Sequence, residues 1–196
     1  MTKSIRHFLD LSDLSAHDVR HILDAALARK QKRAGLPNGT VDEDMPLKGH
    51  LLAMVFDKPS TRTRVSFDLA MRQLGGQSLM LNQSDMQLGR GEPLSDTAQV
   101  LSGYVDAMMV RTGPHENILE LAKYASIPVI NGLTAFSHPC QIIADIMTFE
   151  EHRGPIEGHK IAWMGDGNNV AVSWIHAAAL LGFELHLAVA DDFRPP

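Results

Sequence analysis

Apolar and polar residues alternate along the chain in blocks of two kinds. Short apolar runs bounded by turn residues, such as Leu51–Phe56, are typical of buried strands, and apolar residues three and four positions apart indicate helices. Over residues 15–33 this spacing places Val19, Leu23 and Leu27 on one helical face. The two kinds of block then alternate, which favours an α/β fold with a parallel sheet. The expected strands cover 51–56, 77–81, 107–110, 128–130, 159–164 and 184–190, and the expected helices cover 62–74, 95–103, 115–124, 137–151 and 170–181.

Gly154 and Pro155 interrupt this alternation and suggest a domain boundary. We expect residues 1–153 to form one domain, a parallel sheet with helices on both faces. Residues 154–196 hold a single β-α-β unit, and two strands are too few for a stable sheet. Either this unit docks on the first domain, or the chain is the front part of a longer protein, which the unfinished sheet favours.

Composition excludes several functional classes. A hydrophobic content of 44% with 21% charged residues is ordinary for a soluble globular protein, and a net charge of −5 provides no basic field for nucleic acid. The single cysteine excludes an internal disulfide framework, and the ten histidines show no metal-ligand spacing, so we expect no metal. Without a signal peptide or an apolar run of membrane length, a cytoplasmic location is the default expectation.

The strongest chemical signal lies between the strand at 51–56 and the helix that follows it. A helix N-terminus presents unpaired backbone N–H groups, and here serine and threonine hydroxyls accompany them. Arg62 and Arg64 add two guanidinium groups, although basic residues are disfavoured at a helix N-terminus. A serine cap with two solvated arginines is the alternative, but the combination favours a site for an oxyanion such as phosphate.

Three further polar features follow expected strands or lie in a loop. Arg111 comes directly after the strand at 107–110, His138 follows the strand at 128–130, and glycines punctuate a polar loop at 87–92. Open α/β sheets bind ligands at the carboxyl ends of their strands. Taken alone, each feature has a structural alternative: Arg111 as a surface arginine, His138 as a capped loop histidine and 87–92 as a flexible turn. Taken together, the three features favour one ligand site.

Cys140 lies two positions from His138 and raises the question of a cysteine nucleophile. Residues two apart on a helix point to different faces, so the two side chains are not expected to pair. We interpret Cys140 as a small packed side chain next to Ile142 and Ile143.

Four segments resemble, in order, motifs of the aspartate/ornithine carbamoyltransferase family. Residues 56–67 resemble its carbamoyl phosphate signature, whereas 87–98, 138–145 and 165–169 resemble the ornithine branch. Four motifs in register over nearly the whole chain are far more specific than one. The resemblance implies a carbamoyl phosphate-binding domain over 1–153 and the start of a Rossmann-like, ornithine-binding domain over 154–196.

The resemblance also implies a reaction and its reactants. The carbamoyl group of carbamoyl phosphate would be transferred to the δ-amine of L-ornithine, giving L-citrulline and phosphate. No cofactor or metal would be needed, and no nucleic acid or membrane would be involved. A homotrimer or a multiple of trimers would be the assembly. The phosphate would be held by Ser60, Thr61, Arg62 and Thr63.

The remaining implied roles concern the carbamoyl group. Thr63, Arg111 and His138 would contact the carbonyl oxygen and stabilise the charge that develops on it. Gln141 would bind the carbamoyl NH2 group, and Gln87 would reach the phosphate from a neighbouring subunit.

The acceptor is less narrowly defined by these residues. Asn169 would contact the α-amino acid, but the family's later ornithine motifs would lie beyond residue 196. Putrescine, acylated ornithine and aspartate stay open as acceptors, although the 87–92 loop argues against aspartate. A truncated, non-catalytic carbamoyl phosphate-binding paralogue is a further alternative, and a synthetic or degradative role in arginine metabolism would use the same site.

A dinucleotide-binding oxidoreductase is the alternative from a different class. Gly165 and Gly167 follow an expected strand, as in a dinucleotide fingerprint, but Val170 replaces the third glycine. A partial fingerprint of this kind is weak.

Overall fold

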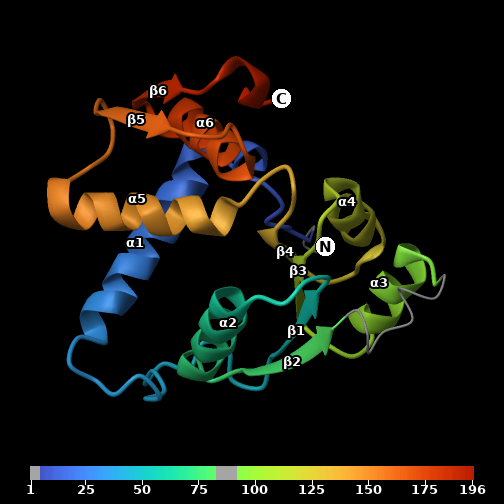
Figure 1. The fold of residues 1–196 in the computed structure, drawn as a ribbon. Helices are drawn as coiled ribbons and strands as arrows, with labels where there is room; N and C mark the ends of the chain where they lie inside the picture. Colours follow the sequence, from blue (N-terminus) through green and yellow to red (C-terminus); the bar gives the residue numbers. More distant parts are fainter. Residues whose placement is uncertain (1–4, 83–91) are drawn as a thin grey trace. The chain divides into compact units, whose positions relative to one another are not determined.

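The computed structural model describes residues 5–82 and 92–196 (Figure 1). The chain separates into two compact units, each described by itself below. The first unit holds Met1–Leu9 and Arg33–Gly132, and the second holds Asp10–Lys32 and Leu133–Pro196.

A four-stranded sheet forms the centre of the first unit. Its strand order is β2 (Gln77–Asn82), β1 (Leu51–Phe56), β3 (Ala107–Arg111) and β4 (Val129–Leu133). β1 runs parallel to both β2 and β3, and its last residue, Phe56, is in register with Asn82 and Arg111. The carboxyl ends of three strands therefore meet at one edge of the sheet.

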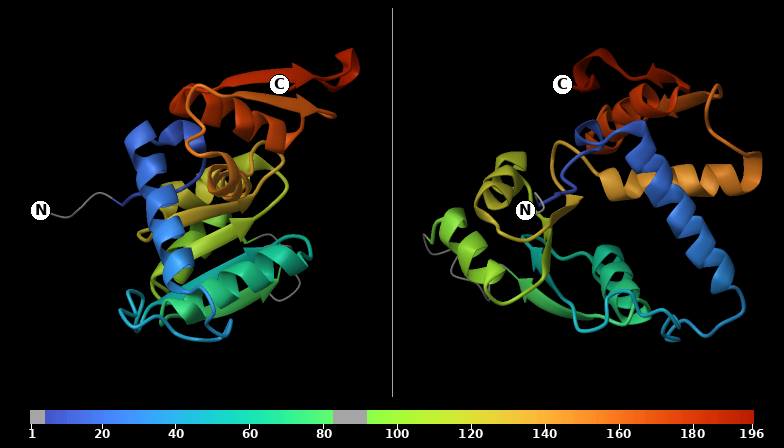
Figure 2. Two further views of the ribbon diagram at one scale, coloured as in Figure 1. Left: turned by 90° about the vertical axis from the view of Figure 1, so that its left-hand side faces the viewer. Right: turned by 180° about the vertical axis from the view of Figure 1, so that it is seen from behind.

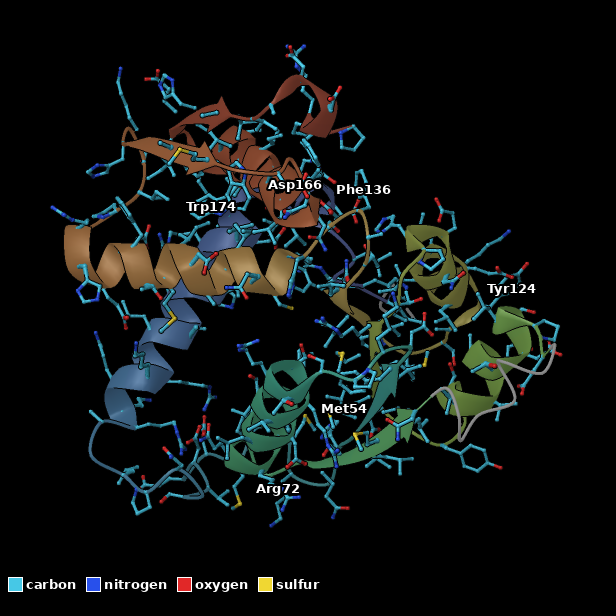
Figure 3. The ribbon with its side chains drawn as sticks, viewed as in Figure 1. Met54, Arg72, Tyr124, Phe136, Asp166 and Trp174 are labelled. Carbon is cyan, nitrogen blue, oxygen red and sulfur yellow. The ribbon has the colours of Figure 1, made fainter. Side chains whose placement is uncertain are left out.

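Helices cover both faces of this sheet (Figures 1 and 2). On one face lies α2 (Thr61–Gln73), and on the other lie α3 (Leu94–Ser102) and α4 (His115–Tyr124). The side chains of β1 alternate between the two faces, as the pleat of a strand requires. Leu52, Met54 and Phe56 pack with Met71 of α2, whereas Ala53 and Val55 pack with residues of α3 and α4 (Figure 3 labels Met54).

The second unit contains a two-stranded parallel sheet and several helices. β5 (Lys160–Met164) pairs with β6 (Glu184–Ala188), and α6 (Asn169–Leu181) connects them. α1 (Ala16–Lys32) packs against α5 (Pro139–Arg153), and two ion pairs join these helices, Arg20 with Glu150 at 2.8 Å and Lys30 with Glu151 at 2.7 Å. Two short 3-10 helices complete the unit, η1 (Leu11–Asp13) and η4 (Asp191–Phe193).

The predicted α/β fold class is confirmed, including the parallel sheet with helices on both faces. The predicted helices and strands are all present, with some shifted ends. The strand predicted at 128–130 continues to Leu133, and the helix predicted from residue 137 begins at Pro139, where proline suits the first turn. The predicted division into two functional domains, 1–153 and 154–196, stays a prediction. The two compact units are defined by contacts within the chain and not by function. Among the described residues, no helix combines the length and apolar character that crossing a bilayer requires.

Candidate functional site

The turn between β1 and α2 presents the open N-terminus of a helix. Ser60 occupies the N-cap position, yet within the described part of the chain its side chain makes no capping hydrogen bond. Its hydroxyl instead donates to Thr63 Oγ1 at 3.0 Å. The first turn of α2 contains no acidic residue, and Arg62 is exposed there. The N–H groups and the positive end of the helix dipole are thus available to an anion.

Arg111 joins this turn from the neighbouring strand. Because Arg111 ends β3 in register with Phe56, its side chain starts beside the β1–α2 turn. Arg111 Nη1 donates to Thr63 Oγ1 at 3.1 Å, so the threonine oxygen contacts both Ser60 and Arg111. Burial lowers the pKa of the Arg111 guanidinium, which still remains protonated at physiological pH. Three predicted site residues therefore meet at one point.

A partly buried hydrogen-bond network fixes the two strand ends to each other. The hydroxyl of Thr112, a residue that is only 6% exposed, donates to Asp57 Oδ2 at 2.6 Å, and Gly113 N donates to the same oxygen at 3.2 Å. Asp57 N in turn donates to the carbonyl of Arg111 at 3.0 Å, and Asn117 Nδ2 donates to Thr112 Oγ1 at 3.2 Å. The sequence placed Thr112 directly after a strand and Asp57 within the 56–67 motif, but it predicted no role for either residue.

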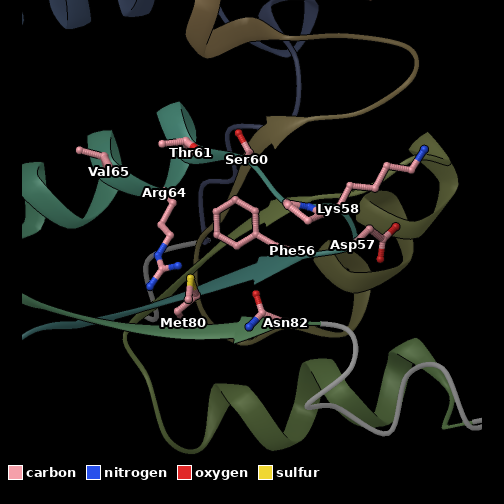
Figure 4. A pocket seen from close by; sticks show the side chains of 10 residues that line it. Phe56, Asp57, Lys58, Ser60, Thr61, Arg64, Val65, Met80 and Asn82 are labelled. Carbon is pink, nitrogen blue, oxygen red and sulfur yellow. The ribbon is translucent and has the colours of Figure 1, made fainter.

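A pocket of about 670 Å³ opens beside the turn (Figure 4). In the close view Arg64 extends from α2 toward Met80 on β2, and the hydroxyls of Ser60 and Thr61 lie above Phe56. Arg111 lines a separate, smaller pocket of about 230 Å³, together with Asp57 and Thr112. The lining of the larger pocket consists of Phe56, Asp57, Lys58, Pro59, Ser60, Thr61, Arg64, Val65, Met80 and Asn82.

The second unit contains the predicted site residues His138, Gln141 and Asn169. His138 is half-buried at the N-cap of α5, and its backbone N–H donates to Ser173 Oγ at 2.8 Å. The Asn169 amide donates to the carbonyl of Thr134 at 2.6 Å, so it is directed at the loop that carries His138.

Gln141 and Gln87 complete the predicted set. Gln141 is exposed on α5, where its Nε2 donates to Asp145 Oδ1 at 2.8 Å. Burial raises the pKa of the Asp145 carboxyl. Gln87 lies outside the described residues, as does most of the 87–92 loop. Glu92, at the end of that loop, accepts a hydrogen bond from the Thr97 hydroxyl at 3.1 Å.

Comparison with known proteins identifies the family. The family model for the aspartate/ornithine carbamoyltransferase carbamoyl-P binding domain matches residues 6–151. The chain belongs to this family. The ornithine carbamoyltransferase of Nitrobacter winogradskyi is 57% identical over 195 residues, and that of Rhodopseudomonas palustris strain BisA53 is 55% identical, each match covering 100% of this chain and 62% of the relative. The chain therefore spans less than two thirds of the length of these relatives.

Solved structures show the same similarity in three dimensions. The ornithine carbamoyltransferase structure from Pyrococcus furiosus superposes with a TM-score of 0.90 at 48% identity, covering 97% of this chain and 59% of that one. The structure from Thermus thermophilus gives a TM-score of 0.88 at 37% identity, covering 96% and 63%. The carbamoyl phosphate signature predicted at 56–67 falls within the matched family domain.

In this chain, backbone atoms of residues 193–195 occupy the space beside Gly167 in the glycine-rich turn after β5. A Cβ atom at Gly167 would lie 2.5 Å from the carbonyl oxygen of Phe193 and 2.4 Å from the nitrogen of Pro195. In a dinucleotide fingerprint the corresponding space admits the pyrophosphate. The Asn168 side chain also caps α6 by accepting from Val170 N at 3.0 Å. Both observations weigh against the oxidoreductase alternative.

Cys140 has the environment of a packed side chain. It is half-buried, and burial raises the pKa of its thiol to about 12. The thiol is therefore protonated at neutral pH, whereas a nucleophilic cysteine acts as the thiolate.

Proposed function

We propose that the protein binds carbamoyl phosphate and transfers its carbamoyl group to the δ-amine of L-ornithine, giving L-citrulline and phosphate. The observation that carries this proposal is the meeting of Ser60, Thr63 and Arg111 at the open N-terminus of α2. The names of the relatives support ornithine as the acceptor.

The phosphate group would occupy the N-terminus of α2. The backbone N–H groups of the first turn and the hydroxyls of Ser60, Thr61 and Thr63 are hydrogen-bond donors of the kind that bind phosphate at helix ends. Arg62, exposed on that turn, would add a charge-assisted contact to the dianion. Together these groups would bind the donor without a metal ion or a cofactor.

Catalysis would then rest on stabilising the carbonyl oxygen. The neutral δ-amine of ornithine attacks the carbonyl carbon, and negative charge develops on the oxygen, where Arg111, His138 and the Thr63 hydroxyl would receive it. The bond from carbon to the bridging oxygen breaks, phosphate leaves with the electron pair, and the amine loses a proton. No covalent enzyme intermediate is required, because positioning and electrostatics supply the rate enhancement.

The remaining assignments follow the family. Gln141 would contact the carbamoyl NH2 group, Asn169 the α-amino acid, and Gln87 the phosphate from a neighbouring subunit. We propose a homotrimer or a multiple of trimers, located in the cytoplasm. A non-catalytic paralogue would share the phosphate site but would form no citrulline.

Titration calorimetry tests the donor site directly. We expect carbamoyl phosphate to bind and NAD not to bind. Substitution of Arg62→Ala should weaken carbamoyl phosphate about 10-fold or more, because a hydrogen bond to a charged group contributes about 1.5–3 kcal/mol. Arg72→Ala is the matched control: it removes an arginine from the last turn of the same helix, where Arg72 pairs with Asp68 at 2.9 Å.

Two results would contradict the proposal. Binding of NAD without any affinity for carbamoyl phosphate or phosphate would favour the oxidoreductase alternative. An identical dissociation constant in the Arg62→Ala and Arg72→Ala proteins would remove Arg62 from the site. A colorimetric citrulline assay then separates the transferase from a binding-only paralogue.

A further inference from the structure

Two side chains of α6 hold the loop that precedes α5. Ser173 Oγ accepts from the backbone N–H of His138 at 2.8 Å, and Asn169 Nδ2 donates to the carbonyl of Thr134 at 2.6 Å. The loop is also closed on itself, since Thr134 N donates to the Ser137 carbonyl at 3.0 Å and Ser137 N donates to Thr134 Oγ1 at 3.1 Å. The 134–138 loop is thus a compact turn, bonded to α6 near each end.

The Ser173 hydroxyl makes one hydrogen bond within its helix and a second one outside it. It is fully buried, with 0% of its surface exposed, and its hydroxyl donates to the carbonyl of Asn169 at 3.0 Å. This bond, to the residue four positions earlier, is ordinary for a serine in a helix and slightly disfavours the helix. The acceptor function of the same oxygen is used by His138. The hydroxyl therefore links the body of α6 to the main chain of His138.

A main-chain anchor at His138 determines where the imidazole can lie. His138 is the N-cap of α5 and has non-helical backbone angles. The helix holds its carbonyl, which accepts from Gln141 N at 3.1 Å, whereas its N–H is held by Ser173. A histidine side chain turns about only two bonds, and the range of ring positions follows from the position of its Cα atom. A shift of the 134–138 loop would therefore move the ring.

We propose that Ser173 is a positioning residue for His138. By accepting the His138 N–H, its hydroxyl holds the main chain so that the imidazole meets the carbonyl oxygen of carbamoyl phosphate. This inference rests on the role that the proposed function gives to His138. Ser173 itself touches no reacting atom, and its effect reaches the reaction through the backbone of His138.

The first test compares Ser173→Ala with Thr148→Ala in the protein at its natural length. Thr148 on α5 makes the same kind of bond, to the Ala144 carbonyl at 2.8 Å, and is exposed. Both substitutions remove a hydroxyl bond within a helix, but only Ser173→Ala removes the acceptor of His138 N–H. Its kcat should fall about 10- to 100-fold, as expected for misplaced catalytic groups, while Thr148→Ala keeps the wild-type kcat.

A binding ratio separates positioning from a general loss of structure. Carbamoyl phosphate carries the carbonyl that His138 would contact, whereas inorganic phosphate does not. In Ser173→Ala the dissociation constant for carbamoyl phosphate should rise about fivefold, which corresponds to the loss of one ordinary hydrogen bond. The dissociation constant for inorganic phosphate should stay unchanged. Ser173→Thr keeps a hydroxyl and should restore most of the ratio.

The outcomes separate the two proposals. If wild-type protein binds no carbamoyl phosphate, both the proposed function and the positioning role are overturned. If wild-type protein binds it, but Ser173→Ala leaves kcat and the ratio unchanged or weakens both ligands equally, only the positioning role is overturned. Should Ser173→Ala fail to fold, Ser173→Cys replaces it, because cysteine has a similar volume but its sulfur is only a weak acceptor. If this folded variant keeps the wild-type ratio of the two dissociation constants, the positioning role is overturned.

Discussion

Arg111 and Thr63 are 48 positions apart in the sequence, and their side chains share a hydrogen bond of 3.1 Å. The contact exists because β1 and β3 are parallel neighbours whose last residues are in register. It places a guanidinium beside the first turn of α2, where Ser60 also donates to the Thr63 hydroxyl. Thr63 therefore stands between the groups proposed to bind the phosphate and the arginine proposed to bind the carbonyl oxygen.

The first prediction concerns this threonine. Thr63→Val keeps the shape of the side chain but removes the oxygen that contacts Ser60 and Arg111. We expect the affinity for carbamoyl phosphate, measured by calorimetry, to fall about 10-fold, because a hydrogen bond involving a charged group contributes about 1.5–3 kcal/mol. Ser66→Ala is the control, since the Ser66 hydroxyl bonds only to the Arg62 carbonyl among the described contacts. Equal affinities in the two variants would show that the Thr63 hydroxyl plays no part in binding.

The second prediction concerns the network behind Arg111. Thr112→Val removes the hydroxyl that donates to Asp57 at 2.6 Å and leaves that carboxylate with the Gly113 N–H. Urea unfolding should show a loss of about 1.5–3 kcal/mol, the contribution of one hydrogen bond to a charged group. Asn117→Ala removes a longer bond of 3.2 Å to the same hydroxyl, which remains paired, and should cost less. A larger loss for Asn117→Ala than for Thr112→Val would contradict the central position of Thr112.

The third prediction concerns pH and the ion pair between α1 and α5. Burial acts to raise the pKa of the Glu150 carboxyl, but the hydrogen bond and charge of Arg20 and the N–H of Ile156 outweigh it, so the pKa is lowered. A carboxyl whose pKa is lowered on folding stabilises the fold at pH values above its unfolded-state pKa. This stabilisation is lost as the pH falls through the folded-state pKa. At pH 7, Glu150→Gln should therefore cost about 1 kcal/mol in the free energy of unfolding.

This difference should disappear in acid. As the pH falls through the lowered folded-state pKa of Glu150, the wild-type carboxyl becomes protonated, and the two proteins should converge in stability. Glu151→Gln is the matched control on the same helix: its partner Lys30 has a side chain that is 60% exposed, against 37% for Arg20. Its loss should stay below about 0.5 kcal/mol, as is usual for exposed pairs. A Glu150→Gln difference that is the same at pH 3 and pH 7 would argue against an electrostatic origin.

Local periodicity was enough to predict the succession of helices and strands. The run Leu51–Phe56 is a strand buried on both faces, as an unbroken apolar run indicates, and His115–Tyr124 is helical over the predicted range. Errors occurred at element ends, such as the strand that continues to Leu133. The ends depend on hydrogen bonds to distant segments, for example from Asn131 N to the Phe8 carbonyl at 2.8 Å, which no local pattern encodes.

The candidate site divides in the same way. The candidate anion site at the turn between β1 and α2 could be predicted because its residues are contiguous and its chemistry is local to one helix end. The sequence predicted no role for Asp57, Thr112 or Ser173, because each bonds to a partner that comes near only on folding. Asn169 was predicted as a ligand contact, and its bond to the Thr134 carbonyl appears only in the structure.

By itself, the sequence determined the α/β class, the order of elements and the position of the candidate anion-binding turn between β1 and α2, because these depend on residue spacing and on one helix terminus. Only the tertiary structure decided that Arg111 bonds to Thr63, and that Ser173 holds the backbone of His138. Strand register and helix packing set those distances, and both result from the simultaneous burial of many apolar side chains rather than from any local run of residues.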